Sequence, residues 1–341
     1  MNEKQLVDDS NPAGLPTIAL LGMGGTIASS AGVATQLSDY RVTTGVDLLI
    51  QAVPALQSVA RFEYEQLANI ESHQISDGLL LRLAQRVNAW LTMPHISAVV
   101  ITHGTDTLEE TAYFLNLVVQ SHKPVVLVGA MRPATALSAD GPLNLFHAVV
   151  VALSPQSVGK GVLAVMNDRI LAARYVNKAH TTNVDAFVVP EQGCLGVVSG
   201  QDVQYFNTTT RRHTLSSALH IPDGLQSLPP VDIIYDHQGA GVHLYEAALR
   251  AGVQGIVLAG TGNGSLSPAA RAGAALALEK QVPFVRASHV QQGSVRPSEK
   301  DVDRGLVAAQ SLNPHKARIL LRLALLNTRD RETLQRFFNE Y

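Results

Sequence analysis

The chain has 341 residues, of which 46% are hydrophobic and only 5% aromatic, and its formal net charge is −2. A chain of this length exceeds what one hydrophobic core usually serves, so we expect two domains. The balanced charge, without a basic block, argues against nucleic-acid binding. The single cysteine, Cys194, excludes an intrachain disulfide, and we interpret it as a small buried residue.

The start of the chain lacks the pattern of a signal peptide. Acidic residues and Pro12 precede the first apolar run, Ile18 to Leu21, which is shorter than the roughly 7–15 apolar residues of a signal core. No stretch approaches the roughly 20 apolar residues of a membrane span. We therefore expect a soluble, cytoplasmic protein. A periplasmic protein is compatible with the sequence if a removed signal peptide has been replaced by a new start.

In the N-terminal part, short β-branched runs alternate with helical patterns. The runs predict strands at 17–21, 98–102, 125–128 and 161–166, and helices at 77–90, 108–119 and 140–153. Acidic residues open the helix at 108–119, and Pro142 suits the first turn of the helix at 140–153. This alternation is typical of right-handed βαβ units and of a parallel sheet buried on both faces.

The alternation stops after about Asp202 and resumes later. The intervening segment, 207–230, is polar and rich in turn-forming residues, so we interpret it as a linker. Beyond it, the sequence predicts strands at 231–235, 255–258 and 283–286, and helices at 244–251, 268–280, 314–326 and 331–338. We expect a larger N-terminal α/β domain (1–206) with a mostly parallel, doubly wound sheet, and a smaller C-terminal α/β domain (231–341).

Two of the predicted strands end at a threonine flanked by glycine. Thr26 follows the first strand, and Thr105 follows the strand at 98–102, with Asp106 directly after it. Because doubly wound sheets bind ligands outside the carboxyl ends of their strands, both threonines can reach one crevice. A lysine downstream, Lys178, completes the parts of a hydroxyl nucleophile with a lysine base.

Simpler interpretations of these residues remain open at this point. Each threonine could cap a helix, and Lys178 could be a solvated surface charge. The glycine-rich run at 22–27 has Ile27 where a dinucleotide-binding fingerprint needs a third glycine, which disfavours an oxidoreductase. His103 has no partner at metal-ligand spacing, so we expect no metal.

Short motifs along the chain carry a more specific signal. They are Gly24-Gly-Thr-Ile27, Thr102-His-Gly-Thr-Asp-Thr107, Gly129-Ala-Met-Arg-Pro133, Ser138-Ala-Asp-Gly-Pro142, Val165-Met-Asn-Asp168 and Gly260-Thr-Gly-Asn-Gly264. Together they resemble the L-asparaginase family, most closely its bacterial type II branch, which includes homologues that also act on glutamine. The first two motifs are the signature blocks of that family. The resemblance runs from about Leu15 to the C-terminus.

The resemblance implies an activity and a catalytic set. It implies hydrolysis of L-asparagine to L-aspartate and ammonia, with L-glutamine as a slower substrate and with no metal or organic cofactor. Thr26 matches the nucleophile, which forms an acyl-enzyme, and Tyr40 matches a tyrosine that contacts it from a loop closing over the substrate. Thr105, Asp106 and Lys178 match a second triad, in which Lys178 polarises Thr105.

The resemblance also implies substrate contacts and an assembly. Ser72 and Asp106 would hold the substrate's carboxylate and amino groups, and Ala130 matches a backbone position near the leaving group. Asn263 and Glu299 would reach the active site of a neighbouring subunit. The implied partners are therefore a small-molecule substrate and further copies of the chain, in a homotetramer built as a dimer of close dimers.

Some details of the sequence depart from the family's pattern. His73 stands where the family usually has Gln or Glu, and a histidine that titrates near neutral pH would make the affinity for asparagine pH-dependent. Glu299 lies in a loop of unusual length, so Asp301 is an alternative for its role. We also expect the backbone N–H groups after Gly24 and Gly25 to stabilise an oxyanion.

Two rival functions share this scaffold. The amide-hydrolysing subunit of a tRNA-dependent amidotransferase carries an extra N-terminal domain, whereas only a short segment precedes Leu15 here. A non-catalytic amino-acid-binding sensor would bind its ligand without turnover. Because a sensor needs no nucleophile, the catalytic set disfavours it.

Overall fold

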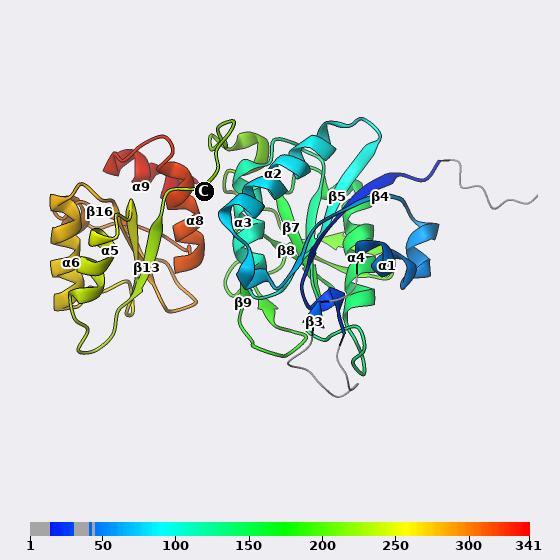
Figure 1. Ribbon diagram of the computed structural model, residues 1–341, viewed down its shortest axis with the longest axis horizontal. Helices are drawn as coiled ribbons and strands as arrows, with labels where there is room; N and C mark the ends of the chain where they lie inside the picture. Colours follow the sequence, from blue (N-terminus) through cyan, green and yellow to red (C-terminus); the bar gives the residue numbers. More distant parts are fainter. Residues whose placement is uncertain (1–13, 31–40, 43–44) are drawn as a thin grey trace, which may run out of the picture.

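The computed structural model describes residues 14–30, 41–42 and 45–341, which form two α/β units on separate sheets (Figure 1). Tyr40, the tyrosine that the resemblance places over Thr26, lies outside the described residues. Within the described part of the chain, no helix combines the length and the apolar character needed to span a membrane.

The larger unit is built on an eight-stranded sheet in the order β12-β11-β8-β7-β6-β5-β1-β4. Its strands are β1 (Thr17–Gly24), β4 (Arg61–Ile70), β5 (Ile96–Thr102), β6 (Val125–Val128), β7 (Val162–Met166), β8 (Arg169–Ala172), β11 (Gly196–Ser199) and β12 (Asp202–Tyr205). The neighbouring strands β7, β6, β5, β1 and β4 pair in parallel. The strands β8, β11 and β12 extend the sheet beyond β7 with antiparallel pairs. The sheet is thus mostly parallel, as predicted.

Helices cover both faces of this sheet. Successive residues of a strand point to opposite faces, so alternate side chains of one strand pack against different helices. Ala19 and Leu21 belong to one buried cluster with α2 (Asp77–Thr92) and α3 (Leu108–Val118). Ile18 and Leu20 belong to another with α1 (Val46–Gln51) and α4 (Gly141–Leu153). The sheet is therefore doubly wound, with its strands buried on both faces.

The smaller unit carries a parallel four-stranded sheet in the order β13-β14-β15-β16. Its elements are β13 (Val231–Tyr235), α5 (His243–Arg250), β14 (Gly255–Gly260), α6 (Pro268–Glu279), β15 (Phe284–Ser288), α7 (Glu299–Asp303), β16 (Leu306–Ala308), α8 (Pro314–Ala324) and α9 (Arg331–Glu340). The segment 207–230 before it holds only one short 3-10 turn, Thr214–Ser216. We propose that the domains divide within this segment.

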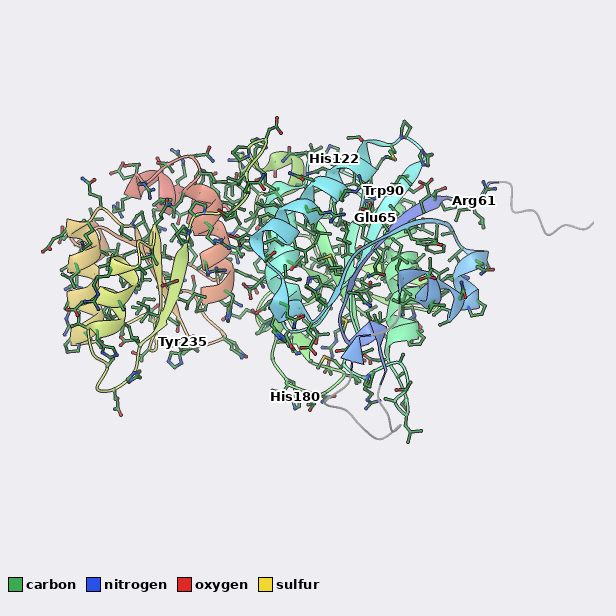
Figure 2. The ribbon with its side chains drawn as sticks, viewed as in Figure 1. Arg61, Glu65, Trp90, His122, His180 and Tyr235 are labelled. Carbon is green, nitrogen blue, oxygen red and sulfur yellow. The ribbon has the colours of Figure 1, made fainter. Side chains whose placement is uncertain are left out.

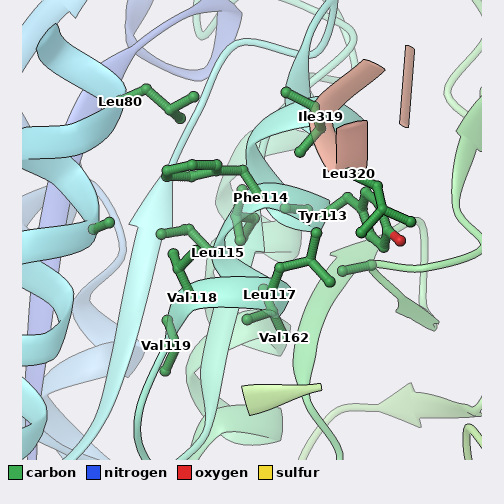
Figure 3. Close-up of a cluster of buried hydrophobic side chains, with 14 of the residues drawn as sticks. Leu80, Tyr113, Phe114, Leu115, Leu117, Val118, Val119, Val162, Ile319 and Leu320 are labelled. Carbon is green, nitrogen blue, oxygen red and sulfur yellow. The ribbon is translucent and has the colours of Figure 1, made fainter. Parts of the chain in front are cut away.

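The two units share apolar contacts through α8, which lies between the two sheets (Figure 1). Ile319 and Leu320 of α8 join the same buried cluster as Tyr113 and Phe114 of α3 (Figure 3). Figure 2 labels Tyr235, the last residue of β13, and His180, which follows the two-residue strand β9 (Asn177–Lys178), on the same lower edge.

Candidate active site

Thr26 lies in a tight turn directly after β1. It begins the 3-10 turn Thr26–Ala28 and is only 6% exposed. Gly24 and Gly25 precede it with φ angles of 94° and 84°, a region that favours glycine. The backbone N–H of Gly25 donates to the Ile70 carbonyl at 3.0 Å. The expectation that this N–H stabilises an oxyanion is therefore wrong, since it already serves the contact with β4.

The turns that follow β1, β4 and β5 meet through glycines. A Cβ atom on Gly25 would lie 2.2 Å from the Cα of Gly104, and a Cβ on Gly104 would lie 2.9 Å from the Cβ of Ser72. No side chain fits at either contact. The structure thus brings the Thr26 turn, the Thr105 turn and Ser72 together at the carboxyl edge of three neighbouring strands.

A lysine joins the hydroxyl of Thr105 to a carboxylate. Lys178, on β9, which pairs with β10 (Phe187–Val188), donates from Nζ to Thr105 Oγ1 at 2.9 Å and to Asp106 Oδ1 at 2.6 Å. Thr105 is buried, whereas the Asp106 side chain is 63% exposed. Because an ammonium group only donates, Thr105 Oγ1 accepts this bond, and its own proton can point to a third group.

Ala130 lies in the loop that follows β6 and closes another side of the crevice. A Cβ atom on Gly129 would lie 3.0 Å from Thr105 Cγ2. A Cβ on Gly141 would lie 3.1 Å from Ile27 Cγ1 and 3.3 Å from the Ala130 Cβ. The loop thus runs beside both threonine turns, and Ala130 is fully buried there.

Asp140 and Asn144 at the start of α4 hold this loop. The carboxylate of Asp140 accepts from the backbone N–H groups of Met131 and Arg132, both at 2.9 Å. Asn144 Nδ2 donates to the Gly129 carbonyl at 3.1 Å and to Asp140 Oδ2 at 3.0 Å. Sequence reasoning assigned neither residue a role, although the motif at 138–142 contains Asp140.

His103 lies beneath the Thr105 turn and is completely buried. Burial lowers the pKa of its imidazole to about 4, although the hydrogen bond to the Gly104 carbonyl (Nδ1···O 2.7 Å) opposes this shift. The ring is neutral at physiological pH, so Nδ1 donates to Gly104 and fixes the tautomer. This places His103 as a support for the turn.

Ser72 and His73 lie in the 3-10 turn Ser72–Gln74 that follows β4. Ser72 Oγ accepts from the backbone N–H of Thr107 at 3.2 Å, and Thr107 Oγ1 donates to the Ser72 carbonyl at 2.9 Å. His73 is exposed, and its Nε2 lies 3.5 Å from Glu71 Oε2. Both residues line a hollow of about 200 Å³ that Arg318 of α8 also lines.

Asn263 and Glu299 lie on the smaller unit and are exposed. Asn263 lines a cavity of about 290 Å³ together with Asn177, the residue before Lys178. Glu299 begins α7. Among the described residues, no hydrogen bond or ion pair joins either side chain to Thr105 or Lys178.

Asp301, the alternative to Glu299, is buried and paired inside the smaller unit. Its carboxylate accepts from Arg286 Nε at 3.0 Å and from Arg286 Nη2 at 2.7 Å, and the backbone N–H of Ser298 adds a bond of 2.8 Å. With these partners it cannot take the exposed role considered for it. Its position is structural.

Fold and site together define a two-domain α/β enzyme of the hydrolase class, with hydroxyl and ammonium groups gathered at the strand ends of its larger sheet. Residues 17–211 match the family model "Asparaginase, N-terminal", and residues 230–338 match the model "Glutaminase/Asparaginase C-terminal domain". The chain belongs to the asparaginase family.

Similar proteins match over nearly the whole chain. L-asparaginase 2 of Bacillus subtilis is 48% identical, over 96% of this chain and 87% of its own length. The glutaminase-asparaginase of Acinetobacter glutaminasificans is 43% identical, over 95% of this chain and 99% of its own. The crystal structure of a probable cytoplasmic L-asparaginase from Campylobacter jejuni superimposes with a TM-score of 0.93 at 43% identity, covering 96% of this chain and all of that one.

Proposed function

We propose that the chain hydrolyses L-asparagine to L-aspartate and ammonia at the crevice formed by Thr26, Thr105 and Lys178, with L-glutamine as a slower substrate. The observation that carries this proposal is the pair of hydrogen bonds from Lys178 to Thr105 and to Asp106, which lies beside the Thr26 turn. The printed names of the similar proteins supply the substrate class, since they include both L-asparaginases and glutaminase-asparaginases.

In the first half-reaction, Thr26 Oγ attacks the side-chain amide carbon of the substrate. The proton of the hydroxyl passes to the amide nitrogen, the C–N bond breaks, and ammonia leaves. An ester between Thr26 and the aspartyl group remains. In the second half-reaction, water adds to this ester, its proton returns to Thr26 Oγ, and aspartate departs.

Thr105 is suited to move protons in these steps. Lys178 occupies its oxygen as a donor, so the Thr105 proton is directed toward the substrate or the attacking water. The positive charge of Lys178 also favours the developing negative charge on Thr105 when that proton moves. We therefore assign Thr26 as nucleophile and the Thr105–Lys178 pair as the proton-transferring partner.

Substrate binding uses the exposed groups around this pair. The Asp106 carboxylate, 63% exposed, would receive the ammonium group of the amino acid, and Ser72 would receive its carboxylate. Ala130 would present its backbone to the leaving ammonia. Tyr40, outside the described residues, would close over Thr26.

We further propose a homotetramer in which Asn263 and Glu299 complete the site of a neighbouring subunit. Their exposure on the smaller unit supports this, since exposed polar side chains are available to a second chain. We place the protein in the cytoplasm, the compartment named for the Campylobacter jejuni structure; the relative from Haemophilus influenzae is described instead as probable and periplasmic. Light scattering during gel filtration tests the assembly, and a monomer with full activity contradicts it.

Ammonia release tests the proposed reaction. L-asparagine and L-glutamine are each supplied at micromolar and millimolar concentration to the wild-type protein, to Thr26→Ala, and to Thr208→Ala, which changes an exposed threonine. We expect release from asparagine by the wild type and by Thr208→Ala, and a loss of about 10⁴-fold in kcat for Thr26→Ala.

Mass spectrometry of a rapidly quenched reaction adds the intermediate, since an aspartyl ester on the peptide that contains Thr26 identifies the nucleophile. Binding of asparagine without any ammonia release would instead favour a sensor. An unimpaired Thr26→Ala enzyme would refute the assignment of the nucleophile.

A further inference from the structure

The segment before Lys178 is bound by the start of α8. Asn313 Nδ2 donates to Asn177 Oδ1 at 2.7 Å, and Lys316 Nζ donates to the backbone carbonyl of Val176. Asn313 and Lys316 belong to the smaller unit, whereas Lys178 and the two residues before it belong to the larger one. The smaller unit therefore contacts both residues that lead into the proposed catalytic lysine.

The strand β9, which consists of Asn177 and Lys178, is separate from the eight-stranded sheet. It pairs with β10 in a two-stranded sheet, and so short a ladder is marginally stable by itself. Val176 is fully buried in the apolar cluster, so the chain is fixed one residue before this strand. Asn177 is then the point at which a side chain can hold the strand close to Lys178.

The two amide groups meet in a defined orientation. Asn313 is the N-cap of α8, and its Oδ1 accepts from the backbone N–H of Lys316 at 2.9 Å. Asn177 Nδ2 donates to the backbone carbonyl of Tyr175 at 3.0 Å. Because a backbone N–H only donates and a carbonyl only accepts, these bonds turn Asn313 Nδ2 and Asn177 Oδ1 toward each other.

The start of α8 also contacts the helix that follows the Thr105 turn. Asn313 Nδ2 lies 3.4 Å from Oε1 of Glu109, which is in the first turn of α3. The same turn region supplies Thr105 Oγ1 and Asp106 Oδ1, the two acceptors of Lys178 Nζ. Since a lysine carries its ammonium group on a flexible four-carbon stem, the place of its backbone decides whether Nζ reaches both acceptors.

We propose that Asn313 is a positioning residue whose hydrogen bond to Asn177 sets the place of Lys178 relative to Thr105. The two asparagines act through Lys178 and are not themselves catalytic. This inference rests on the function proposed above for Lys178. It gives the smaller unit a role in the site of its own chain, besides the contact with a neighbouring subunit proposed for Asn263.

Four variants test this hydrogen bond. Asn177→Leu removes it at similar side-chain volume, and Asn313→Ser removes it while keeping an oxygen that caps α8. Asn177→Asp is the conservative variant, because it keeps an acceptor for Asn313 Nδ2. The matched control is Asp77→Asn. Asp77 on α2 pairs with Arg322 on α8, so this variant weakens another contact between the two units.

Ammonia release from L-asparagine gives kcat and KM for each variant. We expect Asn177→Leu and Asn313→Ser each to lower kcat about tenfold and to change KM by less than about twofold, because a misplaced Lys178 affects proton transfer more than binding. Asn177→Asp and Asp77→Asn should keep the kcat of the wild type. The double variant Asn177→Leu/Asn313→Ser should be no slower than the slower single variant, since both changes remove one bond.

Thermal unfolding and crystallography complete the test. Thermal unfolding should show that Asp77→Asn loses stability although its kcat is unchanged, which separates a loosened junction from a misplaced lysine. In a crystal structure of Asn177→Leu, the distance between Lys178 Nζ and Thr105 Oγ1 should exceed about 3.2 Å. If Asn177→Leu does not fold, the kcat and the crystal structure of Asn313→Ser decide.

Three outcomes would overturn the positioning role while leaving the proposed function intact. One is an unchanged kcat in the folded Asn177→Leu or Asn313→Ser protein. Another is a loss of kcat in Asp77→Asn as large as that in Asn177→Leu. The third is an Asn177→Asp protein as slow as Asn177→Leu. A wild type that releases no ammonia, or a fully active Lys178→Met protein, would instead overturn the proposed function and this inference together.

Discussion

Two aspartate–cation pairs of almost equal length serve different purposes in this chain. Lys178 and Asp106 approach to 2.6 Å at the strand ends of the larger sheet. Arg286 and Asp301 approach to 2.7 Å inside the smaller unit. Distance alone does not tell the two pairs apart. The difference lies in what else each group contacts and in how far each is exposed.

Arg286 and Asp301 use their remaining hydrogen-bonding groups to hold backbone segments of the smaller unit. Arg286 donates to the backbone carbonyls of Asn263 at 2.8 Å and Arg296 at 2.9 Å, and the two side chains are only 8% and 4% exposed. Lys178 instead donates to the hydroxyl of Thr105, and Asp106 is mostly exposed. A pair that fixes backbone is structural, whereas a pair that leaves a hydroxyl and a carboxylate open to a ligand is suited to chemistry.

Replacing Lys178 tests the pair of Lys178 and Asp106, which we name the chemical pair, and should have the largest effect on kcat. We expect Lys178→Met to lower kcat for asparagine about a thousandfold, because Thr105 loses the group that polarises it. The free energy of unfolding should change by less than about 1 kcal/mol, since Asp106 stays solvated. Lys280→Met, at an exposed position, is the control.

Thr105→Ala and the double variant Lys178→Met/Thr105→Ala extend this measurement. If the two residues act as one unit, the double variant is no slower than either single variant. Additive losses in kcat would contradict the shared role. A strong loss of stability in Lys178→Met would show that this pair, like that of Arg286 and Asp301, is structural.

Replacing Asp301 tests the structural pair. Asp301→Asn leaves the buried Arg286 charge without its anion, so we expect the free energy of unfolding to fall by about 3 kcal/mol. Glu299→Gln, on the same short helix but exposed, should leave it unchanged. Urea denaturation measures both. An Asp301→Asn protein as stable as the wild type would contradict the assignment.

The same pair should impose an acid limit on stability. Burial alone would raise the pKa of the Asp301 carboxyl, but the hydrogen bonds and charge of Arg286, with further bonds from Ser298, hold that pKa below its usual value. A depressed folded-state pKa contributes stability above the unfolded value, about 3.9 for aspartate, and the contribution disappears as the pH falls through the folded value. The stability difference between the wild type and Asp301→Asn should therefore be constant at neutral pH and shrink below about pH 4.

Gly25 tests whether the chemical pair depends on contact with the Thr26 turn. A Cβ at this position would lie 2.2 Å from Gly104, and its φ of 84° disfavours any other residue. We expect Gly25→Ala to destabilise the fold by about 2 kcal/mol and to reduce kcat roughly tenfold or more, because the two turns must separate. Gly200→Ala, at a φ of 58° with nothing within 4 Å, should cost about 1 kcal/mol and leave kcat unchanged.

Much of the fold follows from the sequence because buried strands and amphipathic helices have clear patterns. The strands at 125–128 and 231–235 have the predicted bounds, and α2 and α6 match within a few residues. The strand β4 (Arg61–Ile70) was not predicted. It lies at the edge of the sheet, and all of its residues except Leu67 are exposed or partly exposed, so it lacks the continuous apolar run of its neighbours.

The site is less predictable, because its contacts join distant segments. The approach of Thr26 and Thr105 follows from the rule that parallel strands end at the same edge. Lys178 lies on a two-residue strand without a local signal. The sequence offered it as a base or as a surface charge, and only the family resemblance favoured a role beside Thr105. The hydrogen bonds that Asp140 accepts from the loop after β6, and the burial of Asp301, depend on tertiary contacts with loops, which no local pattern reveals.

His73 should have the smallest effect, because it takes no part in the hydrogen bonds of Lys178 to Thr105 and Asp106. It is exposed, and it follows Ser72, the residue proposed to receive the substrate carboxylate. An imidazole N–H at this position can donate one hydrogen bond to that carboxylate. His73→Ala removes this donor, so the KM for asparagine should rise about threefold, a difference of roughly 0.7 kcal/mol.

His73→Gln keeps an amide donor at this position, so its KM should stay closer to that of the wild type than the KM of His73→Ala does. The kcat should stay within a few-fold of the wild type, because the hydrogen bonds of Lys178 to Thr105 and Asp106 do not involve this side chain. Initial rates at saturating and subsaturating asparagine measure both quantities. Equal KM values for the wild type and His73→Ala would show that the carboxylate of the substrate does not bind His73, and would leave Ser72 as the group that receives it.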